Sequence, residues 1–347
     1  MNKKAILLAI LAAALYGVGS PFAKLLLAQI PPVLLAALLY LGAGLGMLAV
    51  NRIRGLGGQR SNEAKLTRVE LPFVIGMVVL DVAAPVFLMI ALTLTTAANA
   101  SLLNNFEIVA TALIALIWFK EAIGRRMWIA IVLITLASSI LSIEDASSFS
   151  FSIGSIFVLL ACACWGLENN FTRMLSLKDP LQIVVIKGFG SGIGSLVLAL
   201  ALGQSSRNFL YLALALVLGF FAYGLSIFFY ISAQRTLGAA RTSAYYAVAP
   251  FIGVAISILL FGQKMTGSFM IALLIMIFGA YFAAVEQHSH LHTHEAITHE
   301  HKHQHQDGHH THQHDGNFIR EHSHVHAHEA QAHAHAHTPD LHHKHRH

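Results

Sequence analysis

Histidine carries the clearest chemical signal in this chain, and its distribution is one-sided. All 23 histidines fall between His288 and His347, and many alternate with a single other residue, as in HVHAHEAQAHAHAH. Neutral imidazole is a common ligand for Zn, Ni, Co and Cu, and this spacing lets neighbouring side chains reach one ion in an extended chain. The segment therefore predicts a tail that binds several exchangeable metal ions, represented by His322, His324, His326, His328, His333, His335 and His337.

The same tail, residues 288–347, has no apolar periodicity and almost nothing to bury, so we expect it to be disordered on its own. Bound metal should leave on acidification, because histidines protonate near pH of about 6.5. A tail that only solvates the protein or buffers charge is the alternative. Beyond these ions, the sequence predicts no required cofactor.

A second group of reactive side chains lies in otherwise apolar sequence. Asp81, Glu107, Glu168 and Lys187 each interrupt a long apolar stretch. An ionisable group inside a membrane span costs at least about 2.5–3.5 kcal/mol on insertion scales, so each needs a reason. Because burial favours the neutral form of a carboxyl group, Asp81 and Glu107 are candidates for a proton-coupling residue. The simpler interpretation of Lys187 is an ion pair with one of the carboxylates.

Polar neighbours surround two of these carboxylates. Glu107 shares one predicted helix face with Ser101, Asn104, Asn105 and Thr111, at steps of three and four residues. Such a stripe avoids lipid, so it either lines a water-filled cavity or makes hydrogen bonds between helices. A similar cluster around Glu168 contains Trp165, Asn169 and Thr172. Both clusters are candidate parts of a substrate or ion pathway.

Asp81 precedes a proline, Pro85, within its stretch. Proline removes a helix hydrogen bond, so we expect it to break the helix and to expose backbone carbonyls to a substrate or ion.

Composition sets the elements that must position these groups. The chain is 56% hydrophobic and only 11% charged, whereas soluble domains carry about 25% charged residues. A membrane span needs roughly 20 apolar residues. The sequence predicts an all-α integral membrane protein with ten such spans, at about 5–28, 30–50, 69–92, 97–119, 125–143, 152–172, 182–202, 209–232, 240–261 and 268–285. The first is too long for a cleaved signal peptide and lacks a cleavage site.

The basic residues indicate the orientation of these spans. With the N-terminus in the cytoplasm, the outer side keeps only Arg207, Lys264 and Lys24. The inner side holds Lys3, Lys4, Arg52, Arg54, Arg60, Lys65, Arg68, Lys120, Arg125, Arg126, Arg173, Lys178, Arg235 and Arg241. This positive-inside bias predicts a protein of the plasma (inner) membrane, with both termini and the histidine tail on the cytoplasmic side. The net charge of +5 is thus a topology signal, and nucleic-acid binding has no support.

The apolar part of the chain repeats itself. PPVLLAALLYLGAGLG (31–46) matches DPLQIVVIKGFGSGIG (179–194), and ALTLTTAANAS (91–101) matches AQRTLGAARTS (233–243). Each repeat has five predicted helices, and an odd number forces the second copy into the membrane upside down. Inverted repeats of this kind are typical of secondary transporters. Tyr245 and Tyr246 fall on the second copy of the polar stripe, and are candidates for aromatic contact with an organic solute or for plain packing.

Residues 99–141 and 241–282 carry a family resemblance. Each resembles the fourth and fifth helices of an EamA repeat in the drug/metabolite transporter superfamily, and the similarity covers residues 5–285. The resemblance implies ten helices, cytoplasmic termini and export or exchange of small metabolites. It departs at the Glu-Pro pair of the fourth helix, which reads Glu107-Ile108 in the first copy and Ala249-Pro250 in the second. Matching residues of the two halves are therefore not expected to share one role.

The domains follow from the repeats: 1–145 and 146–287 are the two EamA repeats and 288–347 is the tail. We expect a secondary transporter of a small organic solute, not an enzyme, since the membrane part contains no histidine and no Walker motif. A divalent Zn, Ni or Co permease whose tail buffers its cargo is the alternative, and a membrane metal receptor without transport is a further one. The expected partners are the lipid bilayer, the small-molecule or metal-ion substrate and a second copy of the chain.

Overall fold

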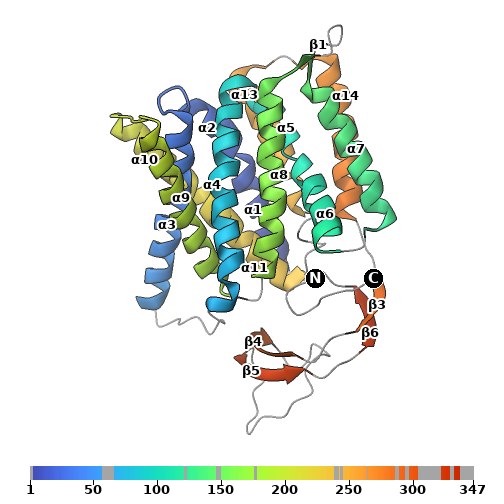
Figure 1. The fold of residues 1–347 in the computed structure, drawn as a ribbon. Helices are drawn as coiled ribbons and strands as arrows, with labels where there is room; N and C mark the ends of the chain where they lie inside the picture. The colour runs from blue at the N-terminus through green and yellow to red at the C-terminus, as the bar shows by residue number, and fades with distance from the viewer. Residues whose placement is uncertain are drawn as a thin grey trace.

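The computed structural model has one helical bundle and a short strand-containing tail (Figure 1). It describes residues 3–56, 66–120, 123–145, 150–175, 178–237, 242, 245–263, 265–285, 289–293, 297–303, 322–328 and 332–336.

The helices confirm a membrane protein that crosses the bilayer many times. Within these ranges, 9 helical segments are long and apolar enough to span a membrane, and Ala249–Phe261 is a shorter apolar helix. The helices are α1 (Lys3–Gly17), α2 (Gly19–Leu26), α3 (Pro32–Leu56), α4 (Leu71–Leu94), α5 (Ala97–Leu103), α6 (Phe106–Trp118), α7 (Arg125–Ser142), α8 (Ile153–Met174), α9 (Pro180–Ala201), α10 (Phe209–Gly219), α11 (Ser226–Leu237), α13 (Ala249–Phe261) and α14 (Gly267–Ala284). A short 3₁₀ helix, η1 (Arg68–Glu70), precedes α4. A π-helical segment, η2 (Phe220–Leu225), joins α10 to α11 within one span.

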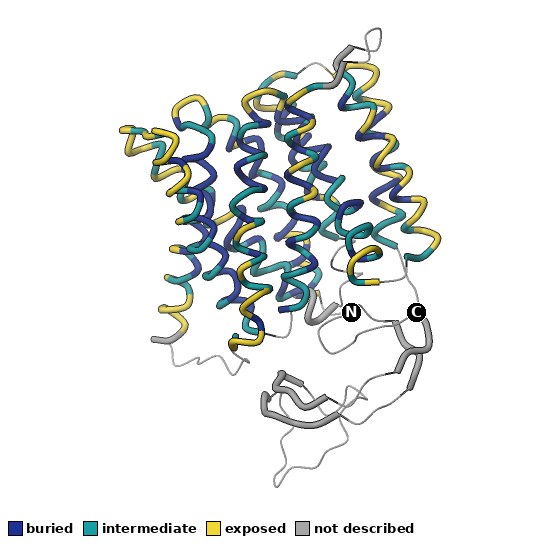
Figure 2. Tube along the Cα trace, viewed as in Figure 1, coloured by how far each residue is buried: buried dark blue, intermediate teal, exposed yellow. Residues whose placement is uncertain are grey.

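The outside of the bundle is apolar, as a lipid-facing surface must be. Large apolar side chains stay exposed on its outer helices, for example Val132 on α7 and Phe278 on α14 (Figure 2). The buried residues are instead rich in alanine, with small residues on almost every helix. Small side chains let helices approach closely where no hydrophobic effect drives them together.

Glycines make the closest of these approaches. A side chain on Gly188 of α9 would lie 2.3 Å from the backbone nitrogen of Gly44 on α3. Gly42 likewise lies against the backbone carbonyl of Leu216 on α10. Only glycine fits at such distances, so Gly42, Gly44 and Gly188 allow these helices to pack backbone against backbone.

Helices far apart in sequence pair across the bundle. The main pairs are α3 with α9, α4 with α8, α7 with α14, α1 with α11, α6 with α8, α3 with α10 and α5 with α13. Arg126, at the start of α7, donates a hydrogen bond to the carbonyl of Val285 just after α14 (2.9 Å). Helix α14 therefore ends where α7 begins, and in Figure 1 this is the end of the bundle at which α1 starts.

Three of the predicted spans are interrupted. The first is divided at Val18, between α1 and α2, and the fourth at Asn104-Asn105, between α5 and α6. The ninth has a turn at Ala247-Val248 directly before α13. Residues 238–241, 243 and 244, where the predicted ninth span begins, lie outside the described residues.

The prediction that the helix breaks at Pro85 is wrong. Helix α4 runs without interruption from Leu71 to Leu94, with Pro85 inside it. Membrane helices tolerate an internal proline because neighbouring helices and side chains can satisfy the backbone groups that it frees.

Short antiparallel strand pairs complete the structure. β1 (Ile143–Asp145) pairs with β2 (Ser150–Phe151) between α7 and α8. In the tail, β3 (Ser289–Thr293) pairs with β6 (Ala332–Ala336), and β4 (Ile297–His303) with β5 (His322–His328). Isolated two-stranded ribbons are only marginally stable in water, so these strand pairs do not contradict the predicted disorder of the free tail. That disorder remains a prediction.

Candidate functional site

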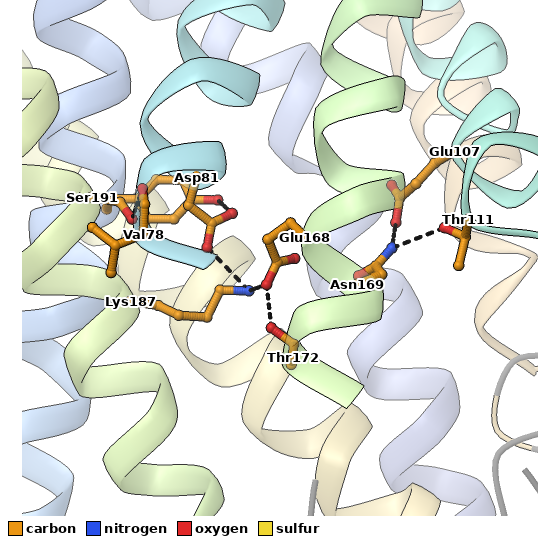
Figure 3. A network of polar contacts seen from close by, with 10 residues as sticks. Val78, Asp81, Glu107, Thr111, Glu168, Asn169, Thr172, Lys187 and Ser191 are labelled. Atoms are coloured by element: carbon orange, nitrogen blue, oxygen red, sulfur yellow. Dashed lines mark hydrogen bonds and ion pairs between the residues drawn. The ribbon is translucent and has the colours of Figure 1, made fainter. Parts of the chain in front are cut away.

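The centre of the bundle contains an ion triad of two carboxylates and one ammonium. Lys187 Nζ lies 2.8 Å from Glu168 Oε1 and 3.2 Å from Asp81 Oδ2. The three residues come from α9, α8 and α4, and Figure 3 shows their side chains converging. All three are buried, with at most 6% of any residue exposed. Because the three groups are buried, the positive charge of the ammonium and the negative charges of the carboxylates must compensate one another.

Two hydroxyl groups donate hydrogen bonds to the carboxylates of the triad. The hydroxyl of Tyr40, on α3, donates to Asp81 Oδ1 (3.0 Å). Thr172, one turn after Glu168 on α8, donates to Glu168 Oε1. With two carboxylates against one lysine, the triad keeps one excess negative charge when all three groups are ionised.

Glu107 belongs to a neighbouring polar group between α6 and α8 (Figure 3). Asn169 Nδ2 donates to Glu107 Oε1 (2.6 Å) and lies 3.4 Å from Thr111 Oγ1. Asn170 also bridges these helices, because its Nδ2 donates to the carbonyls of Thr111 and Gly166. Helix α8 thus carries Glu168 toward the triad and Asn169 toward Glu107, on adjacent faces.

A small cavity lies where the interrupted helices meet. Its volume is about 10 Å³, room for about one water molecule. Two polar atoms of its lining, Ser101 Oγ and Asn104 Oδ1, are buried without a hydrogen-bond partner. The cavity is lined by Tyr16, Gly17, Ser20, Ser101, Asn104, Ala249, Pro250 and Gly253.

A row of tyrosines connects the cavity wall to the triad. Ring centroids are 4.8 Å apart for Tyr230 and Tyr246, 5.6 Å for Tyr246 and Tyr16, and 6.3 Å for Tyr16 and Tyr223. Tyr223 and Tyr40 follow at 5.3 Å, and Tyr40 bonds to Asp81. Ring contacts thus link α11 and α1 through η2 to α3, where Tyr40 ends the row at its hydrogen bond to Asp81.

The structure brings most of the predicted pathway residues into two connected places. Asp81, Glu168 and Lys187 form the triad, and Lys187 pairs with both carboxylates rather than with one. Glu107 and Asn169 form the second polar group. Their functional roles remain proposals.

The predicted polar stripe of the fourth span does not form one face. The interruption at Asn104-Asn105 divides it, so Ser101 and Asn104 line the cavity while Glu107 faces Asn169 on α8. Asn105 turns back to its own helix, where its Nδ2 donates to the carbonyl of Leu102 (3.1 Å).

The two candidate tyrosines have different surroundings. Tyr246 stacks with Tyr16 and Tyr230, whereas no ring contact is found for Tyr245 in the described part of the chain. Sequence reasoning missed Tyr16, Tyr40 and Tyr223. The only sequence feature that could have found them is a tyrosine within an apolar span. Tyrosines that merely pack between helices have the same feature.

The described residues offer no ready metal centre in the membrane part. No three histidine, cysteine, aspartate or glutamate side chains come together there. Of the representative tail histidines, the backbone of six lies in β5 or β6, and His337 lies outside the described residues.

Polar contacts also join helices near both ends of the bundle. At one end, Lys178 Nζ lies 3.1 Å from Glu70 Oε1, and the Leu66 amide donates to Gln182. At the other end, Gln204 accepts the amides of Val33 and Leu34 at the start of α3. Each contact joins segments from different halves of the chain.

Known proteins with similar sequences are transporters. A protein described as an uncharacterised transporter of Methanothermobacter thermautotrophicus is 27% identical over 254 residues, which are 69% of this chain and 74% of the relative. An uncharacterised solute carrier family 35 member of Schizosaccharomyces pombe is 25% identical over 137 residues, 38% of this chain and 27% of the relative.

The fold is also found among solved structures. One crystal structure superposes with a TM-score of 0.59 at 18% identity, over 82% of this chain and 96% of the other. The model of the EamA-like transporter family matches twice, over residues 3–143 and 152–285. These two matches cover most of the chain and all of the bundle, so the chain belongs to the EamA-like transporter family.

Proposed function

We propose that this protein is a secondary active transporter that exports or exchanges a small organic solute. The observation that carries the proposal is the meeting of interrupted helices at a buried polar cavity. The turn between α5 and α6 contributes Asn104 to its lining, and the start of α13, directly after its turn, contributes Ala249 and Pro250. Interrupted helices near the middle of the membrane are where secondary transporters bind their substrates.

The mechanism rests on the proposed inverted repeat of residues 1–145 and 146–287. The family model matches once in each half. Gly17 packs against Ile252, and Gly166 packs against Ala110. Tyr16-Gly17 in the first half matches Trp165-Gly166 in the second, and the match of 91–101 with 233–243, extended along the chain, carries Ala110 to Ile252. The two contacts therefore exchange under the proposed two-fold symmetry. Rocking of one half against the other would then expose the cavity to each side in turn.

The closed ends fit an occluded state in such a cycle. The cavity of about 10 Å³ holds about one water molecule and no metabolite, so a transported solute requires the helices to separate. The Glu70–Lys178 pair at one end and the Gln204 contacts at the other are the polar ties that would open alternately.

Asp81 and Glu107 are the proposed proton-coupling residues. Asp81 is fully buried in the middle of α4 and shares Lys187 with Glu168, whereas Glu107 is half-buried in the first turn of α6, against Asn169. A proton on either carboxylate would change the partners available to Lys187 or Asn169, and would thereby bias the packing of α8 against α4 or α6.

The proposed setting is the plasma membrane, with both termini in the cytoplasm. The excess of basic residues on the loops assigned to the inner side supports this orientation. A second copy of the chain remains a proposed partner.

We propose that the tail binds transition-metal ions. The register supports it, because His299 pairs with His326 and His301 with His324 across β4 and β5. Directly opposed residues of an antiparallel pair have Cβ atoms about 4.5–5.5 Å apart. A divalent-metal permease is the second candidate function on account of this tail, although the membrane part of the described chain gathers no set of metal ligands.

Flux into proteoliposomes tests the proposal. The full chain and a chain truncated after Gln287 would be offered Zn, Ni, Co and a panel of organic solutes, with and without a pH gradient. We expect flux of an organic solute through both chains, with its pH dependence lost in Asp81→Asn or Glu107→Gln. Unchanged pH dependence in both variants would refute the assignment of these carboxylates.

The alternatives give different results. Metal flux through the truncated chain would make the membrane part a metal permease, with the tail as a collector. Metal binding with no flux of any solute would make the protein a membrane metal receptor.

A further inference from the structure

We propose that the cavity between α1, α2, α5 and α13 binds the ammonium group of a primary amine. This inference deepens the proposed function and rests on it only for the claim that the amine is the transported solute. Binding at the cavity can stand without transport.

The cavity presents oxygen atoms that lack donors. Ser101 and Asn104 are 3% and 6% exposed, and Ser101 Oγ and Asn104 Oδ1 have no hydrogen-bond partner. Ser142 and Ser257 donate to the carbonyl four residues earlier (2.7 Å each), and Ser138 and Ser195 are unpartnered but do not line this cavity. A buried acceptor without a donor costs free energy, so Ser101 Oγ and Asn104 Oδ1 indicate a missing donor.

Backbone carbonyls add to the acceptors. Pro21 has no N–H group with which to satisfy the carbonyl of Gly17, and Pro250 has none for the carbonyl of Tyr246. A side-chain carbon on Gly253 would lie 2.7 Å from Ser101 Oγ and 2.9 Å from the Gly17 carbonyl oxygen. These two oxygens therefore face the same point of the cavity wall.

The geometry suits an ammonium group. An –NH₃⁺ group has three donors and no acceptor, and it is close in size to the single water that the cavity can hold. Ser101 Oγ, Asn104 Oδ1 and the Gly17 carbonyl are three acceptors on residues that line the cavity. The ring of Tyr16 forms another part of the wall, and an aromatic face attracts a cation.

The charge of the interior favours a cation. Asp81 and Glu168 share one cation, Lys187, and Glu107 bonds to the neutral amide of Asn169. Glu107 follows Asn104 by one helical turn, on the far side of the interruption. A bound cation would offset part of this excess negative charge, whereas an anion would add to it.

Thermal unfolding of the full chain in detergent tests the site without any transport assay. The probes are propylammonium, tetramethylammonium and sodium chlorides at equal ionic strength. We expect propylammonium alone to raise the melting temperature in a saturable manner. In Asn104→Leu its apparent affinity should fall by roughly tenfold or more, the loss expected for one hydrogen bond to a charged group.

Two matched pairs of variants make the test specific to the cavity. Gly253→Ala should abolish stabilisation by propylammonium because its methyl group fills the site, whereas Gly267→Ala has open space around it and should not. Ser101→Ala should weaken the effect, whereas Ser142→Ala, on α7, should leave it unchanged.

Other outcomes overturn the inference. Equal stabilisation by all three salts would be a general ionic effect, and stabilisation by sodium alone would make the cavity a metal-ion site. If none of the three salts raised the melting temperature, the cavity would hold water and not an ammonium group. Propylammonium binding without flux of any solute would instead refute the proposed transport and keep the site.

Discussion

Replacement of Lys187 by methionine is the sharpest test of the ion triad. Methionine has nearly the volume of the lysine stem and no charge, so Lys187→Met removes two ion pairs, at 2.8 and 3.2 Å, and leaves little cavity. Loss of one partner of a buried ion pair costs about 3–5 kcal/mol, because an uncompensated charge stays buried. Two carboxylates would lose their cation here, and the upper part of that range applies.

The assay is thermal unfolding of the purified chain in detergent. At about 2–4 °C per kcal/mol for a domain of this size, we expect the melting temperature to fall by roughly 10 °C or more. Lys4→Met at an exposed position of α1 is the control, and should change it by less than about 2 °C.

A rescue experiment distinguishes charge from shape. Adding Asp81→Asn and Glu168→Gln to Lys187→Met neutralises the two carboxylates, and most of the lost stability should return. If Lys187→Met behaves like Lys4→Met, or if the triple variant is no more stable than the single one, the triad does not hold the three helices by charge compensation.

Three further predictions follow from other contacts. Tyr40→Phe removes the donor to Asp81 Oδ1 and should cost about 1.5–3 kcal/mol in unfolding free energy, the range for hydrogen bonds to charged groups. Gly188→Ala should cost at least about 1–3 kcal/mol, because its methyl group would meet the backbone of Gly44. Zinc binding by the histidine tail, measured by calorimetry, should weaken steeply as the pH falls through about 6.5.

Each of these has a control within the same chain. Tyr211→Phe changes a half-buried tyrosine of α10, and Gly267→Ala changes a glycine with no atom near its added methyl group. Both should leave the melting temperature nearly unchanged. Truncation after Gln287 should remove the zinc signal and leave unfolding of the bundle as it was.

The class of the protein follows from its sequence. Span length, charge bias and apolar content are local properties, because a helix that faces lipid must be apolar over its whole crossing. Nine long apolar helices and a tenth shorter one bear out the predicted spans in the described residues. The cost of a charge in lipid likewise marked Asp81, Glu107, Glu168 and Lys187 as residues that need partners.

The choice of partners needed the tertiary structure. Glu168 and Asn169 are adjacent in sequence but serve different neighbours, Lys187 and Glu107. Which of them faces which helix depends on the rotation of α8 about its axis, and that rotation is set by close packing at residues such as Gly166. Hydropathy along one helix contains no information about the helix beside it.

The positions of the helix breaks also depend on the tertiary structure. Pro85 is the strongest local signal for a break, yet α4 continues through it, whereas the fourth span breaks at Asn104-Asn105 without a proline. A break inside a membrane is stable only where surrounding groups satisfy the freed backbone, so the neighbours decide it rather than the residue itself. The tyrosine row and the cavity arise in the same way, from side chains on separate helices that only packing brings together.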